Sequence, residues 1–350
     1  MRNGGGILRL AGIFALSLAL IFYNAYTLCA GYGAALTDTH AQNTQSAPTV
    51  QSTSSAPSAE NAAQPTADEP KTAPSAAETV AAAASGNVKG KVISNYISPY
   101  KASLSYGGVY VKNSTDLSIN VKEQLEAPLK FKIKKSSEPQ VLIMHTHTTE
   151  TYMTDDTGVY TDAFSSRTRD ETKNMVSVGS IVAEKIKAAG FGVIHDKTEH
   201  DYPKYTGSYT RAAKTITGYL KKYPSIKIVL DLHRDAVSSG DSDKVKLVTE
   251  INGKKAAQVM LVMGSQSGSV TNFPNWQENF RLALKLQQKI EKNYPTLARP
   301  VSLMPKNYNE SLTTGSLLIE FGTDANTVAE AHYSAEMVGS SLAELLNELC

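Results

Sequence analysis

Two histidines stand one residue apart where an apolar run ends, in the stretch VLIMHTHTTE. Side chains at positions i and i+2 of a strand project from the same face, so His145 and His147 would lie together if the strand continued through them. Glu150 closes the same stretch. Histidine and carboxylate side chains are the ligands of hydrolytic zinc sites, so this stretch is a candidate wall of a metal centre.

Two further apolar runs also end in chemically active side chains. IKIVLDLHRD carries His233, flanked by Asp231 and Arg234, and SLLIEFG contains Glu320. Taken singly, each has an ordinary interpretation, because a histidine at a strand end usually makes a structural hydrogen bond and a buried glutamate can pair with an arginine. Ligands bind at the carboxyl ends of the strands in an open α/β sheet, however, and we expect these segments to meet there.

Hydrolysis at such a site requires a carboxylate ligand beside the two histidines, and a general base. RTRDETKN places Asp170 and Glu171 just before a predicted helix, where acidic residues also serve simply to offset the helix dipole. Glu150 is a second candidate, as a ligand or, like Asp231, as a carboxylate that supports one. We expect Glu320 to have a raised pKa, because it ends an apolar strand, and to act as the general base.

The elements that would position these residues alternate between strand and helix. This alternation is typical of a doubly wound, mostly parallel α/β sheet flanked by helices. Short apolar runs predict strands at 141–144, 191–196, 226–233, 257–264 and 316–322. Helical spacing with glycine or proline stops predicts helices at 174–190, 209–224, 276–295 and 326–349.

The N-terminal part of the chain has a different composition. Residues 10–30 contain no charged side chain and follow Arg2 and Arg9, which predicts a transmembrane anchor with a cytoplasmic N-terminus, a cleaved signal peptide being the alternative. The Ala/Ser/Thr/Pro-rich segment after it predicts a disordered linker. GGVYVKN and LKFKIKK predict short strands in a small preamble. The predicted anchor, linker, preamble and extracytoplasmic catalytic domain span 1–36, 37–90, 91–138 and 139–350.

Composition excludes several classes of protein. The net charge is only +2, with 19% charged residues, so the chain lacks the basic stripe of a nucleic-acid-binding protein. Its two cysteines, Cys29 and Cys350, cannot build a disulfide framework or a multi-cysteine zinc site. No G-x-S-x-G nucleophile elbow occurs.

Four blocks of the sequence resemble a known family. VLIMHTHTTETY, GSYTRAAKTITGYLKKYPSIKIVLDLHRDA, NWQENFRLALKLQQKI and SLLIEFGTDANTVAEA closely resemble the stage II sporulation protein P family, over roughly residues 92–350. The resemblance implies a membrane-anchored cell-wall hydrolase related to the zinc N-acetylmuramoyl-L-alanine amidases, with peptidoglycan as its substrate. It also implies action in septal thinning and engulfment during sporulation. The implied partners are stage II sporulation protein D, a lytic transglycosylase, and stage II sporulation protein M.

The resemblance also implies roles for individual residues. The amidases carry a histidine after the first strand, an acidic ligand opening the first helix, a histidine at a later strand end and a catalytic glutamate in a late strand. The loop KNYNES, where the family usually reads RYNQ, adds Asn307 to Arg234 as a residue to orient the peptide or stabilise the oxyanion. The corresponding zinc ligands and catalytic residue here are His145 or His147, Asp170 or Glu171, His233, and Glu320.

Two other functions are compatible with these residues. A zinc endopeptidase or deacetylase would use the same metal ligands on a different bond, and the family is associated with stem-peptide cleavage as well. A non-catalytic scaffold that binds peptidoglycan or a partner hydrolase would need no metal set at all.

Overall fold

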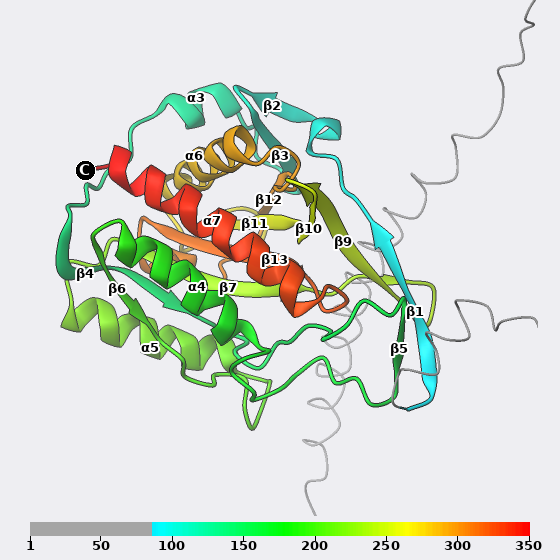
Figure 1. Ribbon diagram of the computed structural model, residues 1–350. Helices are drawn as coiled ribbons and strands as arrows, with labels where there is room; N and C mark the ends of the chain where they lie inside the picture. The colour runs from blue at the N-terminus through cyan, green and yellow to red at the C-terminus, as the bar shows by residue number, and fades with distance from the viewer. Residues whose placement is uncertain (1–85) are drawn as a thin grey trace, which may run out of the picture. The chain divides into compact units, whose positions relative to one another are not determined.

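The computed structural model describes residues 86–350, which fold around two β-sheets (Figure 1). The predicted anchor and nearly all of the predicted linker therefore lie outside the described residues, and their placement stays a prediction. Within residues 86–350, none of the helices has both the length and the apolar character needed to cross a membrane.

The main sheet has eight strands in the order β2-β3-β12-β11-β13-β7-β4-β6. The β2–β3 and β11–β13 pairings are antiparallel and the other five neighbours run parallel, so the sheet is mixed. Its strands are β2 (Leu104–Tyr106), β3 (Val109–Asn113), β4 (Ser136–Met144), β6 (Phe191–His195), β7 (Ile228–Asp235), β11 (Val259–Gly264), β12 (Val301–Met304) and β13 (Ser316–Thr323).

Helices cover both faces of this sheet, as the sequence predicts. On one face, α7 packs against both α4 and α6, and α5 packs on the opposite face (Figure 1). The predicted helices are confirmed to within two residues at each end. Two of them start at local caps: Asn174 caps α4, and Thr327 forms a capping box with Glu330 on α7. The helices are α3 (Val121–Glu126), α4 (Met175–Ala188), α5 (Ser208–Lys222), α6 (Trp276–Asn293) and α7 (Val328–Glu348).

Strand alternation decides which side chains reach which face of the sheet. Leu142 and Met144 of β4 pack in a small cluster with Ala212 and Ile216 of α5, while Ile143 belongs to the large core under α4, α6 and α7. Alternating residues of β7 and β13 also belong to the large core, namely Leu230, Leu232, Ile319 and Phe321. The side chains that alternate with these core residues along the two strands, Asp231, His233 and Glu320, therefore face the α5 side.

The predicted preamble does not stand apart from the rest. Its residues supply β2 and β3 to the main sheet and most of β1 to the second sheet, in which β1 lies between β9 and β5. The strand predicted in LKFKIKK is wrong: Phe131 and Ile133 pack against the core, but the chain enters a strand only at Ser136. The second sheet consists of β1 (Val88–Asn95), β5 (Val159–Thr161), β8 (Ser238–Ser239), β9 (Asp243–Ile251) and β10 (Lys254–Ala257).

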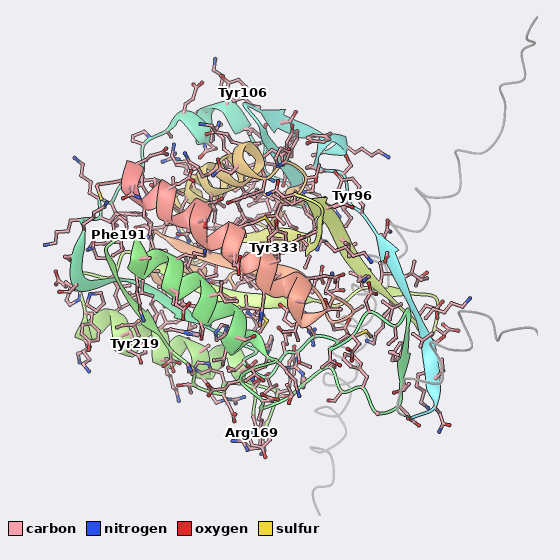
Figure 2. All side chains as sticks on the ribbon, viewed as in Figure 1. Tyr96, Tyr106, Arg169, Phe191, Tyr219 and Tyr333 are labelled. Atoms are coloured by element: carbon pink, nitrogen blue, oxygen red, sulfur yellow. The ribbon has the colours of Figure 1, made fainter. Side chains whose placement is uncertain are left out.

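The second sheet is joined to α7 by buried polar contacts. Lys246 of β9 is almost fully buried, and its Nζ lies 2.9 Å from Glu330 Oε1 and 2.7 Å from Asp156 Oδ1. The hydroxyl of Tyr333, whose place on α7 is labelled in Figure 2, donates to the carbonyl of Ile251. A buried lysine needs such partners, because an unpaired buried charge is strongly unfavourable.

Close packing between α4 and the main sheet depends on Gly179. A Cβ atom at this position would lie 2.5 Å from His195 Nε2 and 2.8 Å from His145 Nε2. Gly179→Ala is therefore expected to lower the free energy of unfolding by about 1–3 kcal/mol through overpacking. Gly218→Ala in α5 is the control: nothing lies within 4 Å of a Cβ atom there. It is expected to raise that free energy by about 0.5–1 kcal/mol through helix propensity. Urea unfolding measures both, and equal effects of the two substitutions would contradict the packing argument.

Candidate active site

The two histidines of HTHTTE occupy different environments. β4 ends at Met144 and the chain enters a turn, so the strand does not continue through the two histidines and they do not share one strand face. His145 is fully buried, with Nδ1 3.1 Å from the Leu232 carbonyl oxygen and Nε2 2.9 Å from His195 Nε2. Both of its ring nitrogens are thus engaged within the fold.

His147 instead lies beside His233, from the next strand of the sheet. The centres of their rings are 5.2 Å apart and the ring planes are nearly perpendicular, at 85°. Tyr205 stacks on His147 at 4.6 Å between ring centres, and Tyr209 meets it edge-on at 5.6 Å. Nδ1 of His147 is buried without a hydrogen-bond partner among the described residues, which leaves that nitrogen available to a ligand.

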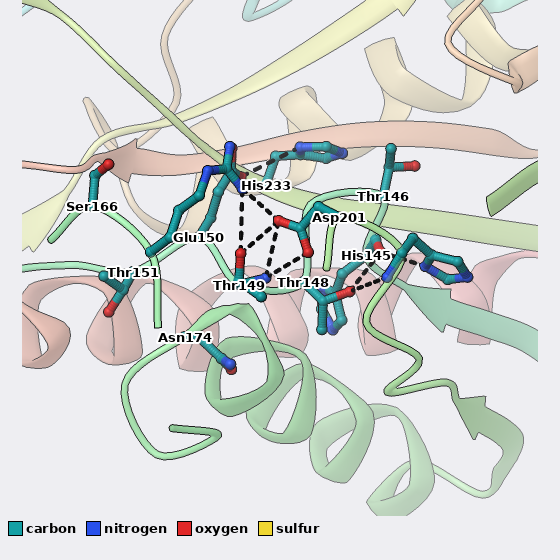
Figure 3. A network of polar contacts seen from close by, with 12 residues as sticks. His145, Thr146, Thr148, Thr149, Glu150, Thr151, Ser166, Asn174, Asp201 and His233 are labelled. Carbon is teal, nitrogen blue, oxygen red and sulfur yellow. Dashed lines mark hydrogen bonds and ion pairs between the residues drawn. The ribbon is translucent and has the colours of Figure 1, made fainter. Parts of the chain in front are cut away.

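Glu150 joins this group through its contact with His233, and both are labelled in Figure 3. Its Oε2 atom lies 3.5 Å from His233 Nδ1 and accepts a hydrogen bond of 3.3 Å from the backbone N–H of Arg234. Its Oε1 atom faces two guanidinium groups, 3.6 Å from Arg167 Nη2 and 3.8 Å from Arg234 Nη1. The carboxylate is buried, so these cations compensate its charge.

Asp231 holds His233 from the opposite end of the imidazole. Its Oδ1 atom lies 2.9 Å from His233 Nε2. The same carboxylate accepts hydrogen bonds from the backbone N–H of Thr146 at 2.8 Å and from the Thr146 hydroxyl at 2.7 Å. This contact is an ion pair rather than a hydrogen bond, since His233 Nε2 has no hydrogen-bond partner among the described residues.

Glu320 lies next to His233, because β13 and β7 pair in register at these two residues. Its Oε2 atom is buried without a hydrogen-bond partner in the described part of the chain. Burial, reinforced by the charge of Asp235, raises the pKa of the Glu320 carboxyl to about 8. A carboxyl with a pKa near neutrality can both accept and return a proton.

The histidines differ in charge for physical reasons. Burial, aided by the positive charges of His233 and Arg167, lowers the pKa of His147 to about 4, so its ring is neutral. Burial also disfavours a charge on His233, but the carboxylates of Asp231 and Glu150 outweigh it and raise the pKa well above the ordinary value. For Glu150, burial is likewise outweighed by His233 and Arg234, and its pKa falls to about 2.

The structure does not bring the two predicted acidic ligands to this group. Asp170 accepts hydrogen bonds from the backbone N–H and hydroxyl of Thr172 and pairs with Lys173 at 3.1 Å. Glu171 pairs with Lys197 at 2.9 Å on the surface. Both carboxylates are engaged near the start of α4, and Glu150 occupies the place beside the histidines that they were expected to take.

The two predicted substrate-binding residues bond to the protein itself. The buried Arg234 donates from Nε to the Thr151 carbonyl and from Nη2 to the Ser166 carbonyl, which ties three segments of the site together. Asn307 Oδ1 accepts hydrogen bonds from the backbone N–H and hydroxyl of Ser311. Their roles toward a substrate stay predictions.

Tyr205, Tyr209 and Tyr308 lie near the histidines, and no sequence motif predicted their place there. Tyr209 stacks toward His233 at 6.5 Å and lies 6.3 Å from Tyr308, between ring centres. Tyr308 and Asn309 both have positive φ, at 51° and 60°, an uncommon conformation that clusters at functional sites. The Asn309 side chain donates to the Tyr209 carbonyl, so this loop is tied to the start of α5. The loop KNYNES therefore lies near the histidines.

The donor set suits zinc in its chemistry. Two histidines and one carboxylate, His147, His233 and Glu150, match the ligands of hydrolytic zinc sites, and His233 would lose its proton on binding the metal. The unpartnered Nδ1 of His147 is an independent observation in favour of such a ligand. Within residues 86–350, no group of three or more His, Cys, Asp or Glu side chains is already arranged closely enough to hold a metal ion.

The family model and the curated relative that match this chain both belong to the same family. The model of the stage II sporulation protein P family matches residues 30–343. Stage II sporulation protein P of Bacillus subtilis (strain 168) is 27% identical over 216 residues, which cover 59% of this chain and 50% of that protein. The chain thus matches about half the length of this curated relative.

Solved structures of amidases are similar at low identity. The CwlD amidase from Clostridioides difficile, solved in complex with the GerS lipoprotein, has a TM-score of 0.38 and 11% identity, covering 60% of this chain and 99% of that one. The N-acetylmuramoyl-L-alanine amidase AmiC2 of Nostoc punctiforme has a TM-score of 0.36 and 12% identity, covering 61% of this chain and 97% of that one. The family match covers most of the sequence, and it confirms the resemblance seen in the sequence blocks: the chain belongs to the stage II sporulation protein P family.

Proposed function

We propose that this protein is a peptidoglycan hydrolase of sporulating cells, and specifically a zinc-dependent N-acetylmuramoyl-L-alanine amidase. The observation that carries the proposal is the meeting of His147, Glu150 and His233 beside Glu320 at the carboxyl ends of β4, β7 and β13. Family membership supports the link to sporulation.

In this proposal His147, His233 and Glu150 hold the metal. Zinc, when bound, lowers the pKa of a water molecule and polarises the scissile carbonyl. Asp231 and Glu150 lie at the two ends of the His233 ring, and this ring is held between the two carboxylates. The neutral ring of His147 offers its buried Nδ1 without first having to lose a proton.

Glu320 handles the proton. Its Oε2 atom accepts a proton from the attacking water and returns it to the nitrogen of the leaving L-alanine. Oε2 is buried although the residue is partly exposed, and burial raises the pKa of the carboxyl to about 8, where it can take up and release a proton. Without metal, Glu320 is protonated at neutral pH; a neighbouring cation favours the ionised form that can act as a base.

The wider setting of the proposal rests on the family. We expect the protein to be anchored in the cell membrane by its N-terminal segment, with the hydrolase outside the cytoplasm. The partnerships with stage II sporulation proteins D and M also stay predictions.

Metal removal tests the proposal directly. The purified protein is expected to contain zinc in a ratio of about one ion per chain, and to digest purified cell-wall sacculi only when that zinc is present. Treatment with 1,10-phenanthroline should stop digestion, and added zinc should restore it. Digestion that continues without metal would contradict zinc hydrolysis, and protein that binds sacculi but neither takes up added zinc nor digests them in its presence would instead favour a scaffold.

A further inference from the structure

Arg167 contacts the proposed metal site from the loop between β5 and α4, and nothing in the sequence pattern pointed to it. We propose that Arg167 is a positioning residue that orients two of the proposed zinc ligands, Glu150 and His147. The inference rests on the proposed function, because it concerns the ligands of that same site.

Backbone and side-chain contacts both fix Arg167 in place. Its backbone pairs with that of Glu150 in an isolated antiparallel bridge, and the next residue, Thr168, donates from its N–H to the Thr149 carbonyl at 2.7 Å. Its guanidinium forms an ion pair through Nη1 with Asp201, whose side chain is fully buried. Asp201 in turn accepts hydrogen bonds from the backbone N–H and hydroxyl of Thr149 (Figure 3).

The first consequence concerns the two oxygens of Glu150. Arg167 Nη2 lies 3.6 Å from Oε1, on the same side as the guanidinium of Arg234, whereas Oε2 faces His233. The cations therefore hold Oε1 away from the histidines and leave Oε2 directed at the site. Because Asp201 balances the charge of Arg167, the guanidinium can do this without adding a full net positive charge beside a bound cation.

The second consequence concerns the ring of His147. The guanidinium carbon of Arg167 lies 4.8 Å from the centre of the Tyr205 ring, and Tyr205 stacks on His147 with an interplanar angle of 14°. Tyr205 is 56% exposed, so little else in the fold restrains it. A guanidinium over the face of an aromatic ring is attracted to it even at an exposed site. Arg167 thus keeps Tyr205, and through it the His147 ring, in one orientation.

Arg169 provides a matched control two residues away. Its Nε lies 2.8 and 2.9 Å from the two carboxylate oxygens of Glu199, and its guanidinium carbon lies 4.4 Å from the centre of the Tyr202 ring. The two arginines therefore make the same kinds of contact, an ion pair and a stack on tyrosine. Arg169 lies at the outer edge of the molecule (Figure 2), and its contacts with Glu199 and Tyr202 do not include a proposed ligand.

The test measures zinc affinity by competition with a chromophoric chelator, together with the thermal unfolding of the metal-free proteins. Arg167→Ala is expected to weaken zinc binding about 10–100-fold, the range seen when a residue that supports a ligand is lost. Arg169→Ala should bind zinc as the parent does. Arg167→Lys should restore only part of the affinity, because lysine keeps the charge but not the planar fork.

Tyr205 supplies a second variant that keeps the test decisive if Arg167→Ala fails to fold. Tyr205→Leu removes the stack at an exposed position and should weaken zinc binding, whereas Tyr205→Phe should preserve it. If the parent binds zinc and Arg167→Ala and Tyr205→Leu bind it equally tightly, the inference about Arg167 is overturned but the proposed function is not. Absence of zinc binding by the parent would overturn the proposed function and the inference with it.

Discussion

Glu320→Gln is expected to lower the rate of peptidoglycan hydrolysis by about 10²–10⁴-fold, the contribution of a positioned general base. Glutamine has nearly the same shape but cannot accept the proton of the attacking water. Zinc affinity should stay close to that of the parent, because Glu320 is not one of the proposed ligands. The measurement is the rate at which soluble fragments are released from sacculi at saturating zinc.

The same substitution is expected to stabilise the metal-free protein. The Glu320 carboxyl has a pKa of about 8 in the fold, against about 4.3 in an unfolded chain. Between these values the folded state holds a proton that the unfolded state has released, so the stability of the parent falls as pH rises through this window. Glutamine does not titrate, so Glu320→Gln should remove this fall, and its free energy of unfolding relative to the parent should rise with pH up to about 8.

Glu310 offers the control for Glu320. Burial raises its carboxyl pKa well above the ordinary value, and its Oε2 accepts a 2.7 Å hydrogen bond from the Gly264 N–H. Glu310→Gln removes a comparable buried carboxyl without touching the histidines, so most of the hydrolysis should remain. A Glu320→Gln variant that is less stable than the parent, or hydrolyses as fast, would show that Glu320 is a structural residue.

His147→Ala is expected to abolish most zinc binding and hydrolysis while leaving the fold intact. It removes a proposed ligand whose Nδ1 has no partner within the described part of the fold. Zinc affinity should fall by more than the roughly 10–100-fold that loss of a supporting residue costs. Chelator competition and sacculus digestion measure the two effects.

His145→Ala should show the opposite pattern. It removes a fully buried ring and leaves the Leu232 carbonyl and His195 without their partner. The free energy of unfolding is therefore expected to fall by about 2–4 kcal/mol, while each folded molecule still binds zinc. If His145→Ala lost zinc while His147→Ala retained it, the zinc ligand would be His145 and not His147.

How far the sequence predicts the site depends on how local each feature is. His233 and Glu320 could be placed because each sits within a strand, and alternation along a strand fixes the face on which a side chain lies. The boundaries of α4 and α7 followed from caps encoded by neighbouring residues. The antiparallel β11–β13 pairing was not readable, because strand order depends on long-range packing.

The carboxylate ligand depends on loops, where no periodicity guides the prediction. Asp170 and Glu171 precede a helix, as expected, but the path of residues 162–173 turns their oxygens to Thr172, Lys173 and Lys197. The turn after Met144 likewise separates His145 from His147. The roles inferred for Arg167 and Tyr205 arise only from contacts between loops, and no pattern in either segment signals them.

The identity of the bond broken tests the central claim most directly. Purified sacculi digested by the zinc-loaded protein, and then analysed by mass spectrometry, should yield stem peptides with a free L-alanine amino group and glycan strands with a newly freed lactyl carboxylate. Glu320→Gln should yield neither product at a comparable rate. Release of fragments cut within the stem peptide alone, or loss of acetyl groups without release of stem peptides, would contradict the amidase assignment.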